Sequence, residues 1–286
     1  VKRGGKCTYK YNYTANASPM DLTPVKLVVT DMDGTLLNSR HQVSSRFFEL
    51  FEALSKHGIQ FAAASGRQYE SIAIKLTPIL DQLVVIAENG GLVRHQGREL
   101  LSTPLDQGLR DQVLERLENI PGTHVVLCGK DTAFLKPPTP EFERQLKEYY
   151  GAFEYMEQLK GFPGEIMKIA VYHFESSEQY IFPEVQGFET DLKVKVSGAH
   201  WVDVSDPLAH KGHALEHVQK QFGIPPEATM VFGDYNNDLE MLTQAEFSFA
   251  MANAHPNVLK TARYKTSSND QEGVESVLTR LLEQLS

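Results

Sequence analysis

The sequence has little of what secreted, membrane-spanning or nucleic-acid-binding proteins require. Its 286 residues include only two cysteines, Cys7 and Cys128, which form neither a disulfide framework nor a metal motif. No apolar run approaches the roughly 18 residues of a membrane span. Lysine and arginine number 28 against 37 acidic residues, and the net charge of −9 argues against nucleic acid or an anionic membrane as the main partner. We therefore expect reduced thiols and a cytoplasmic location.

Residues 1–19 differ in composition from the rest of the chain. They contain four basic residues, no acidic residue and almost no aliphatic residue. A secretory signal needs an apolar core of about 7–15 residues, which is lacking here. We interpret residues 1–19 as an artificial leader and Met20 as the natural start. The hydrophobic fraction of 41% is typical of a folded protein, and the length of 286 residues favours two domains.

Two carboxylates, Asp31 and Asp33, directly follow an apolar run at residues 25–30 that is typical of a buried parallel strand. Open α/β sheets place their ligands at the carboxyl ends of such strands. The spacing of two brings both carboxylates to the strand end, and Gly34 lets the backbone turn sharply. Two acids at a buried strand end repel each other unless a cation is bound there. The pattern indicates a cation site, but an ordinary Asp-Gly turn has the same residues.

Strand and helix patterns alternate on both sides of a central segment. The predicted helices cover residues 44–58, 68–76, 211–223 and 274–282, and the predicted strands cover residues 59–64, 83–87, 229–232 and 247–250. This alternation is typical of an α/β fold with a Rossmann-like, doubly wound parallel sheet.

The central segment mixes strand and helix patterns. Its predicted elements are a hairpin at residues 125–135, helices at 105–119 and 141–150, and strands at 166–174 and 192–196. One-sided apolar patterns here predict an α+β layer with one exposed sheet face.

Three further segments carry polar residues at the ends of such elements. They are Ala64-Ser65-Gly66-Arg67, Lys211-Gly212 and the stretch from Asp234 to Asp238. Together with Asp31–Thr35, and in this order, they resemble the four motifs of the haloacid dehalogenase-like phosphatases, Cof-type subgroup. The resemblance extends from about Val25 to the end of the chain. It implies a catalytic core at residues 20–87 and 204–286, with an inserted α+β cap for substrate specificity at 88–203.

The resemblance also implies the roles of the site residues. Asp31 would be the nucleophile that forms an aspartyl-phosphate, and Asp33 the general acid and base. The cofactor would be Mg²⁺, held by carboxylates of Asp31 and Asp234 and by the backbone carbonyl of Asp33. Asp238 would not bind the ion directly but would orient a metal-bound water or Lys211. The phosphate-binding residues would be Ser65, Gly66, Lys211 and Asn237. The candidate substrate contacts are Arg67, Asn89, Lys168 and Asn253.

These residues predict a magnesium-dependent phosphatase acting on a small phosphorylated metabolite, either a sugar phosphate or a phosphorylated cofactor. A phosphomutase of the same superfamily is one alternative. A non-catalytic phosphate-binding or signalling module is an alternative from another class. Fold analogy does not choose the substrate, and the sequence leaves the oligomeric state open.

Overall fold

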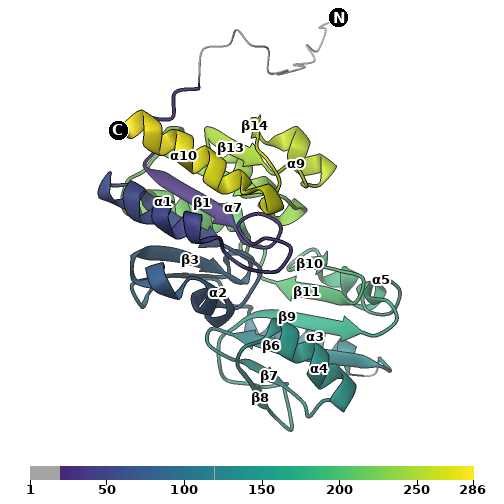
Figure 1. Cartoon of the computed structure of the whole chain (residues 1–286). Coiled ribbons are helices and arrows are strands. Elements are labelled where there is room, and N and C mark those ends of the chain that lie inside the picture. Colours follow the sequence, from purple (N-terminus) through teal and green to yellow (C-terminus); the bar gives the residue numbers. More distant parts are fainter. Residues whose placement is uncertain (1–19, 119) are drawn as a thin grey trace, which may run out of the picture.

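The computed structural model describes residues 20–118 and 120–286, which form two sheets with their helices (Figure 1). Our interpretation of residues 1–19 as a leader lies outside the described residues. None of the helices in the described ranges is long and apolar enough to cross a membrane.

The larger sheet has eight strands, and its six consecutive parallel strands confirm the predicted doubly wound core. In spatial order the strands are β14 (Tyr264–Lys265), β13 (Phe247–Ala250), β12 (Thr229–Gly233), β1 (Leu27–Asp31), β2 (Gln60–Ala64), β3 (Leu83–Ala87), β4 (Leu92–His95) and β5 (Arg98–Ser102). All five residues of the central strand β1 are buried. The parallel strands β12, β1 and β2 therefore end at one edge of the sheet, where Asp234, Asp31 and Ser65 follow one another across it.

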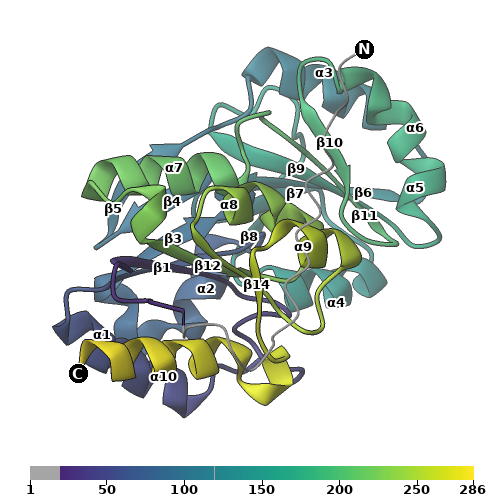
Figure 2. The same ribbon diagram turned by 90° about the horizontal axis from the view of Figure 1, so that it is seen from above.

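Helices cover both faces of this sheet, as Figure 2 shows with α1 and α10 below it and α7 and α8 above it. The core helices are α1 (Ser45–Lys56), α2 (Tyr69–Lys75), α7 (Lys211–Phe222), α8 (Leu239–Thr243), α9 (Pro256–Thr261) and α10 (Gly273–Leu285). The predicted boundaries of α1 and α7 are confirmed. The Ser44 hydroxyl accepts the Phe47 N–H at the start of α1, and Gly223 ends α7 in the left-handed conformation, with φ of 65°. Short 3₁₀ helices lie at Thr77–Gln82, Glu88–Gly90, Gln186–Phe188, Pro226–Ala228, Asn236–Asp238 and Asn269–Gln271.

The smaller sheet has six strands and belongs to the predicted insertion. Its strands are, in spatial order, β10 (Lys193–Val196), β11 (Trp201–Ser205), β9 (Ile166–His173), β6 (Thr123–Gly129), β7 (Ala133–Leu135) and β8 (Phe153–Tyr155). Its helices are α3 (Gln107–Leu117), α4 (Pro140–Tyr149), α5 (Ser177–Tyr180) and α6 (Phe182–Val185).

The prediction that one face of this sheet is exposed is wrong. All eight residues of β9 are buried, because helices lie on both faces. Val113 of α3 and Val185 of α6 pack in one apolar cluster with Val171, whereas Phe142 of α4 packs with Ala170 in another. Neighbouring residues along a strand point to opposite faces, so α4 covers part of the face that we expected to be free.

The lower boundary predicted for the insertion also differs from the sheet pairing. Strands β4 and β5, within the predicted 88–203 segment, pair antiparallel with β3 and with each other, and thereby extend the larger sheet. The smaller sheet begins at Thr123 and its strand β11 runs to Ser205. We therefore propose that the cap, the layer built on the smaller sheet, begins after Ser102 and reaches Ser205.

Candidate active site

Three carboxylates meet at the carboxyl edge of the larger sheet. Asp31 ends β1, Asp234 follows β12, and Asp238 closes the turn after it. Each offers an oxygen within 4.8 Å of the others. The parallel pairing of β1 with β12 brings together groups that lie far apart in the sequence.

Lys211, the first residue of α7, is fully buried beside these acids. Its Nζ donates to Oδ1 of Asp31 at 2.5 Å and to Oδ1 of Asp238 at 2.7 Å. The other oxygen of Asp238 accepts the backbone N–H groups of Asp234, at 2.9 Å, and Tyr235, at 3.1 Å. Both oxygens of Asp238 are therefore engaged by the protein, and this residue holds Lys211 and the turn after β12 in place.

The remaining oxygens fit a hard cation. Oδ2 of Asp31 is buried and has no hydrogen-bond partner among the described residues. Such an oxygen is costly unless a cation compensates it. Gly34, at φ of 81°, keeps the space beside Asp234 open, because a Cβ there would lie 2.3 Å from Asp234 Oδ2. An all-oxygen donor set is the kind that Mg²⁺ prefers, so the residues present fit this ion.

The crowding of these acids shifts their protonation. Burial, followed by the charge of Asp238, raises the pKa of Asp234 to about 6. Burial raises the pKa of Asp31 well above its usual value, and Lys211 opposes that effect. Burial would lower the pKa of Lys211, but Asp238 and Asp31 outweigh it and raise the pKa, so Lys211 stays charged. A bound cation would favour the ionised carboxylates.

Asp33 lies outside this cluster and is paired with Arg67. The guanidinium donates from Nε to Oδ2 at 2.6 Å and from Nη2 to Oδ1 at 2.7 Å. Burial alone would raise the pKa of Asp33, but Arg67 and then His41 outweigh it and lower the pKa. Arg67, which we predicted to contact the substrate, is engaged with Asp33 in this structure.

Two of the predicted phosphate-binding residues, Ser65 and Gly66, lie in the loop after β2, and Asn89 links this loop to a third, Asn237. The Ser65 carbonyl accepts the Asn89 N–H at 2.9 Å, and the Asn89 side-chain carbonyl accepts the Asn237 amide at 3.0 Å. Gly66 leaves room for this contact, since a Cβ there would lie 3.1 Å from the Asn89 amide. Asn89 has a φ of 55° and follows Glu88 at 50°, two strained left-handed residues in succession.

Lys168 of β9 joins the cap to this loop. Its Nζ donates to the carbonyl of Gly66 at 3.1 Å and lies 3.0 Å from Glu88 and 3.8 Å from Asp203. The lysine predicted to contact the substrate is thus held by three protein oxygens.

Asn253, another predicted substrate contact, braces the loop after β1. Its amide donates to the Gly34 carbonyl at 2.8 Å, and its side-chain carbonyl accepts the N–H of Asn269 at 3.2 Å. The structure thus brings Asn253 to the backbone of the loop after β1.

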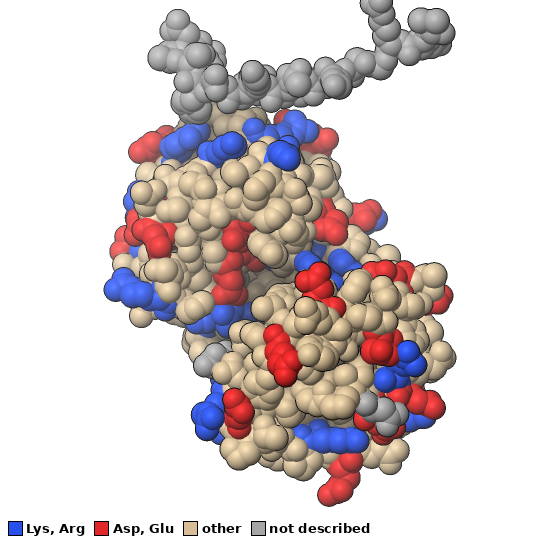
Figure 3. All heavy atoms as spheres, turned by 90° about the vertical axis from the view of Figure 1, so that its right-hand side faces the viewer, with Lys and Arg blue, Asp and Glu red and all other residues tan. Residues whose placement is uncertain are grey.

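A pocket lies where the cap faces the core, and the molecular surface is hollowed where the two layers meet, with both acidic and basic side chains along it (Figure 3). The core contributes Glu88, Asn89, Ala209, His210, Lys211 and Asn237, and the cap contributes Lys168, Lys193, Lys195, Asp203 and Ser205. Sequence reasoning missed Lys193, Lys195, Asp203, Ser205 and His210. The alternation of lysine with valine at 193–196 was the available signal, since it places both lysines on one face.

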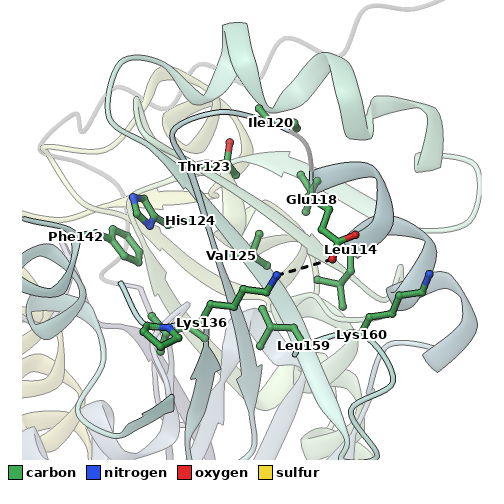
Figure 4. A pocket seen from close by; sticks show the side chains of 13 residues that line it. Leu114, Glu118, Ile120, Thr123, His124, Val125, Lys136, Phe142, Leu159 and Lys160 are labelled. Carbon is green, nitrogen blue, oxygen red and sulfur yellow. Dashed lines mark ion pairs between the residues drawn. The ribbon is translucent and has the colours of Figure 1, made fainter. Parts of the chain in front are cut away.

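A second cavity, of about 240 Å³, lies within the cap, away from the carboxylates (Figure 4). Its walls include Leu114, Val125 and Leu159, and Lys136 lies 3.9 Å from Glu118 at its rim. No residue of the acidic cluster or of the loop after β2 lines it.

The site combines strand-end carboxylates, a buried lysine and a hydroxyl-bearing loop, all beneath an inserted sheet. This combination defines a class of hydrolase. The chain belongs to the haloacid dehalogenase-like hydrolases, whose family model matches residues 28–278, and the predicted resemblance is confirmed. It is 33% identical over 265 residues to the 5-amino-6-(5-phospho-D-ribitylamino)uracil phosphatase YbjI of Escherichia coli, covering 90% of this chain and 96% of that protein.

Two further comparisons agree with this assignment. The Bacillus subtilis phosphatase YwtE, named for the same substrate, is 26% identical over 284 residues, covering 90% of this chain and 98% of that protein. A crystal structure from Eubacterium rectale superposes with a TM-score of 0.84 at 26% identity, covering 90% of this chain and 99% of that one.

Proposed function

We propose that this hydrolase is a magnesium-dependent phosphatase that cleaves a small phosphorylated metabolite through an aspartyl-phosphate on Asp31. The observation that carries the proposal is the state of the Asp31 carboxylate. One of its oxygens is held by Lys211, and the other is buried without a partner among the described residues, at an edge that also presents Asp234. A nucleophile and a cation ligand on one carboxylate suit phosphoryl transfer.

In the first step Asp31 attacks phosphorus in line, and the bond from phosphorus to the leaving oxygen breaks. Asp33 supplies the proton that the departing alcohol needs, which requires its pair with Arg67 to open. In the second step ionised Asp33 takes a proton from water, and that water attacks the aspartyl-phosphate. Inorganic phosphate leaves and Asp31 is restored. The pair with Arg67 favours the ionised Asp33 of this second step.

The phosphoryl oxygens would be bound by the Ser65 hydroxyl, the Gly66 N–H, the Asn237 amide and the Lys211 ammonium group. Asp31, Asp234 and the backbone carbonyl of Asp33 would hold Mg²⁺, which neutralises charge on the transferring group when bound. Asp238 orients Lys211, because its other oxygen is fixed by backbone N–H groups.

The substrate is chosen by groups that the cap brings to the pocket, because the core groups all address the phosphate and the metal. Two relatives are named for 5-amino-6-(5-phospho-D-ribitylamino)uracil, a phosphorylated cofactor intermediate, and we propose it as the first compound to assay. The relatives' phosphatase names favour this activity over the mutase and the non-catalytic module. A cytoplasmic location remains a prediction of the sequence.

Phosphate release from a panel of phosphomonoesters tests the proposal. The wild-type chain should release phosphate with Mg²⁺ and stop in excess chelator. Asp31→Asn should retain the fold, checked by circular dichroism, and lose turnover. Turnover by Asp31→Asn would contradict the covalent mechanism, and full activity in chelator would contradict the metal. Transfer of the phosphoryl group to a second hydroxyl without phosphate release would favour the mutase.

A further inference from the structure

Four lysines line the pocket between cap and core, and three of them have acidic partners. Lys211 pairs with Asp31 and Asp238, Lys168 pairs with Glu88, and Lys193 lies 3.8 Å from Glu240. The fourth is Lys195, which makes no hydrogen bond or ion pair with any residue of the described ranges.

The strand register shows on which face of the smaller sheet Lys195 lies. In the antiparallel pairing of β10 with β11, Lys195 lies opposite Asp203 and Lys193 lies opposite Ser205. Ser205 in turn lies opposite Lys168 of β9. Residues directly opposite share a face of the sheet. This is the face that meets the core, because Lys168 reaches the Gly66 carbonyl from it.

The acid opposite Lys195 attracts it at a distance but makes no ion pair with it. The carboxylate of Asp203 lies 3.8 Å from Lys168, and no ion pair joins it to Lys195. Lys195 is nevertheless partly buried, and burial, followed by the charge of Lys193, lowers its pKa, although the charges of Asp203 and Glu240 oppose this shift. A partly desolvated ammonium group without a partner is unfavourable, and an electron-rich oxygen that enters the pocket offsets this cost.

The phosphoryl group cannot be the intended partner of Lys195 in the proposed mechanism. That group is placed at the strand ends, where Lys211, Ser65 and Asn237 serve it. Lys195 belongs to the cap and lines the adjoining pocket, to which Lys211 and Asn237 contribute from the core. The remaining candidate partner for Lys195 is the leaving group of the substrate.

We propose that Lys195 determines specificity by donating to an electron-rich oxygen of the leaving group, either a carboxylate or a ring carbonyl. Preferred substrates are then phosphomonoesters that carry such an acceptor, rather than phosphates of simple polyols. The proposal rests on the proposed phosphatase function and concerns substrate choice only.

Two matched substrate pairs distinguish the acceptors. One pair is 6-phosphogluconate and sorbitol 6-phosphate, which differ in a carboxylate. The other is 5-amino-6-(5-phospho-D-ribitylamino)uracil and ribitol 5-phosphate, which differ in the carbonyl-bearing ring. The wild-type chain should prefer the acceptor-bearing member of at least one pair. Lys195→Met should lower kcat/KM for that member about tenfold or more, the range expected for a lost charged hydrogen bond, with little change for the simple polyol phosphate.

Two control variants complete the test. Lys195→Arg keeps the charge and should retain most of the preference. Lys136→Met removes an exposed cap lysine beside the second cavity and should leave both ratios unchanged. Equal preference within both pairs in the wild type, or ratios unmoved by Lys195→Met, would overturn the role of Lys195 while leaving the phosphatase intact. No phosphate release from any compound would overturn the proposed function, and this inference with it.

Discussion

Replacing Lys168 with methionine tests the contacts that join the cap to Gly66 and Glu88 of the core. The Lys168 side chain is 10% exposed and that of Glu88 only 1%, and their charged atoms lie 3.0 Å apart. Methionine fills a similar volume but leaves the Glu88 carboxylate buried without its cation. Breaking a buried pair in this way costs about 3–5 kcal/mol, so we expect a loss near 3 kcal/mol in the free energy of unfolding at neutral pH. Urea denaturation followed by circular dichroism measures it.

The pH dependence and a double variant separate this cause from simple loss of packing. Burial raises the pKa of Glu88 above its ordinary 4.5, and Lys168 opposes that rise, so Lys168→Met should raise the pKa further. A carboxyl group whose pKa is raised by folding destabilises the fold fully at pH values above its folded-state pKa. At pH values below its unfolded-state pKa the group is protonated in both states and has no effect. The loss should therefore shrink as the pH falls towards about 4.5, the unfolded value for Glu.

Adding Glu88→Gln to Lys168→Met removes the buried charge and should restore much of the stability. Lys147→Met, on the exposed surface of α4, is the matched control and should change stability by less than about 0.5 kcal/mol. A Lys168→Met protein as stable as the wild type, or a double variant no more stable than the single one, would refute the reasoning.

Three other predictions concern the core. Arg67→Met removes the partner that lowers the pKa of Asp33, so the acidic limb of the profile of kcat against pH should move to higher pH. An unmoved limb would show that Arg67 does not act on the pKa of the catalytic group. Mg²⁺ must displace the proton that Asp234 holds below pH about 6, so activation should need more Mg²⁺ at pH 5.5 than at pH 7.5, and equal requirements would argue against Asp234 as a ligand. Gly34→Ala forces a Cβ to within 2.3 Å of Asp234 Oδ2, so it should abolish Mg²⁺-dependent activity while circular dichroism stays native, and near-normal turnover would show that the space is not needed.

Local patterns were enough to predict the core. The buried strand before Asp31, the apolar stripe of α1 and the glycine that ends α7 depend on interactions within a few residues, which the sequence displays directly. The motifs beginning at Asp31, Ser65, Lys211 and Asp234 were recognisable for the same reason. Parallel strands end at one edge of a sheet, so their proximity also followed from the predicted topology.

Tertiary structure alone decided which distant partner a polar side chain takes. Lys168 and Gly66 are 102 positions apart, and no local pattern reveals that the lysine of one sheet donates to the loop of another. The addition of β4 and β5 to the larger sheet, and the packing of α4 on the cap face expected to be free, depend likewise on which apolar surfaces meet. The sequence determined the chemistry available at the strand ends, because backbone geometry places those groups. Packing between distant elements determined whether Arg67, Lys168 and Lys195 face the protein or the pocket, because such contacts exist only once the two sheets have come together.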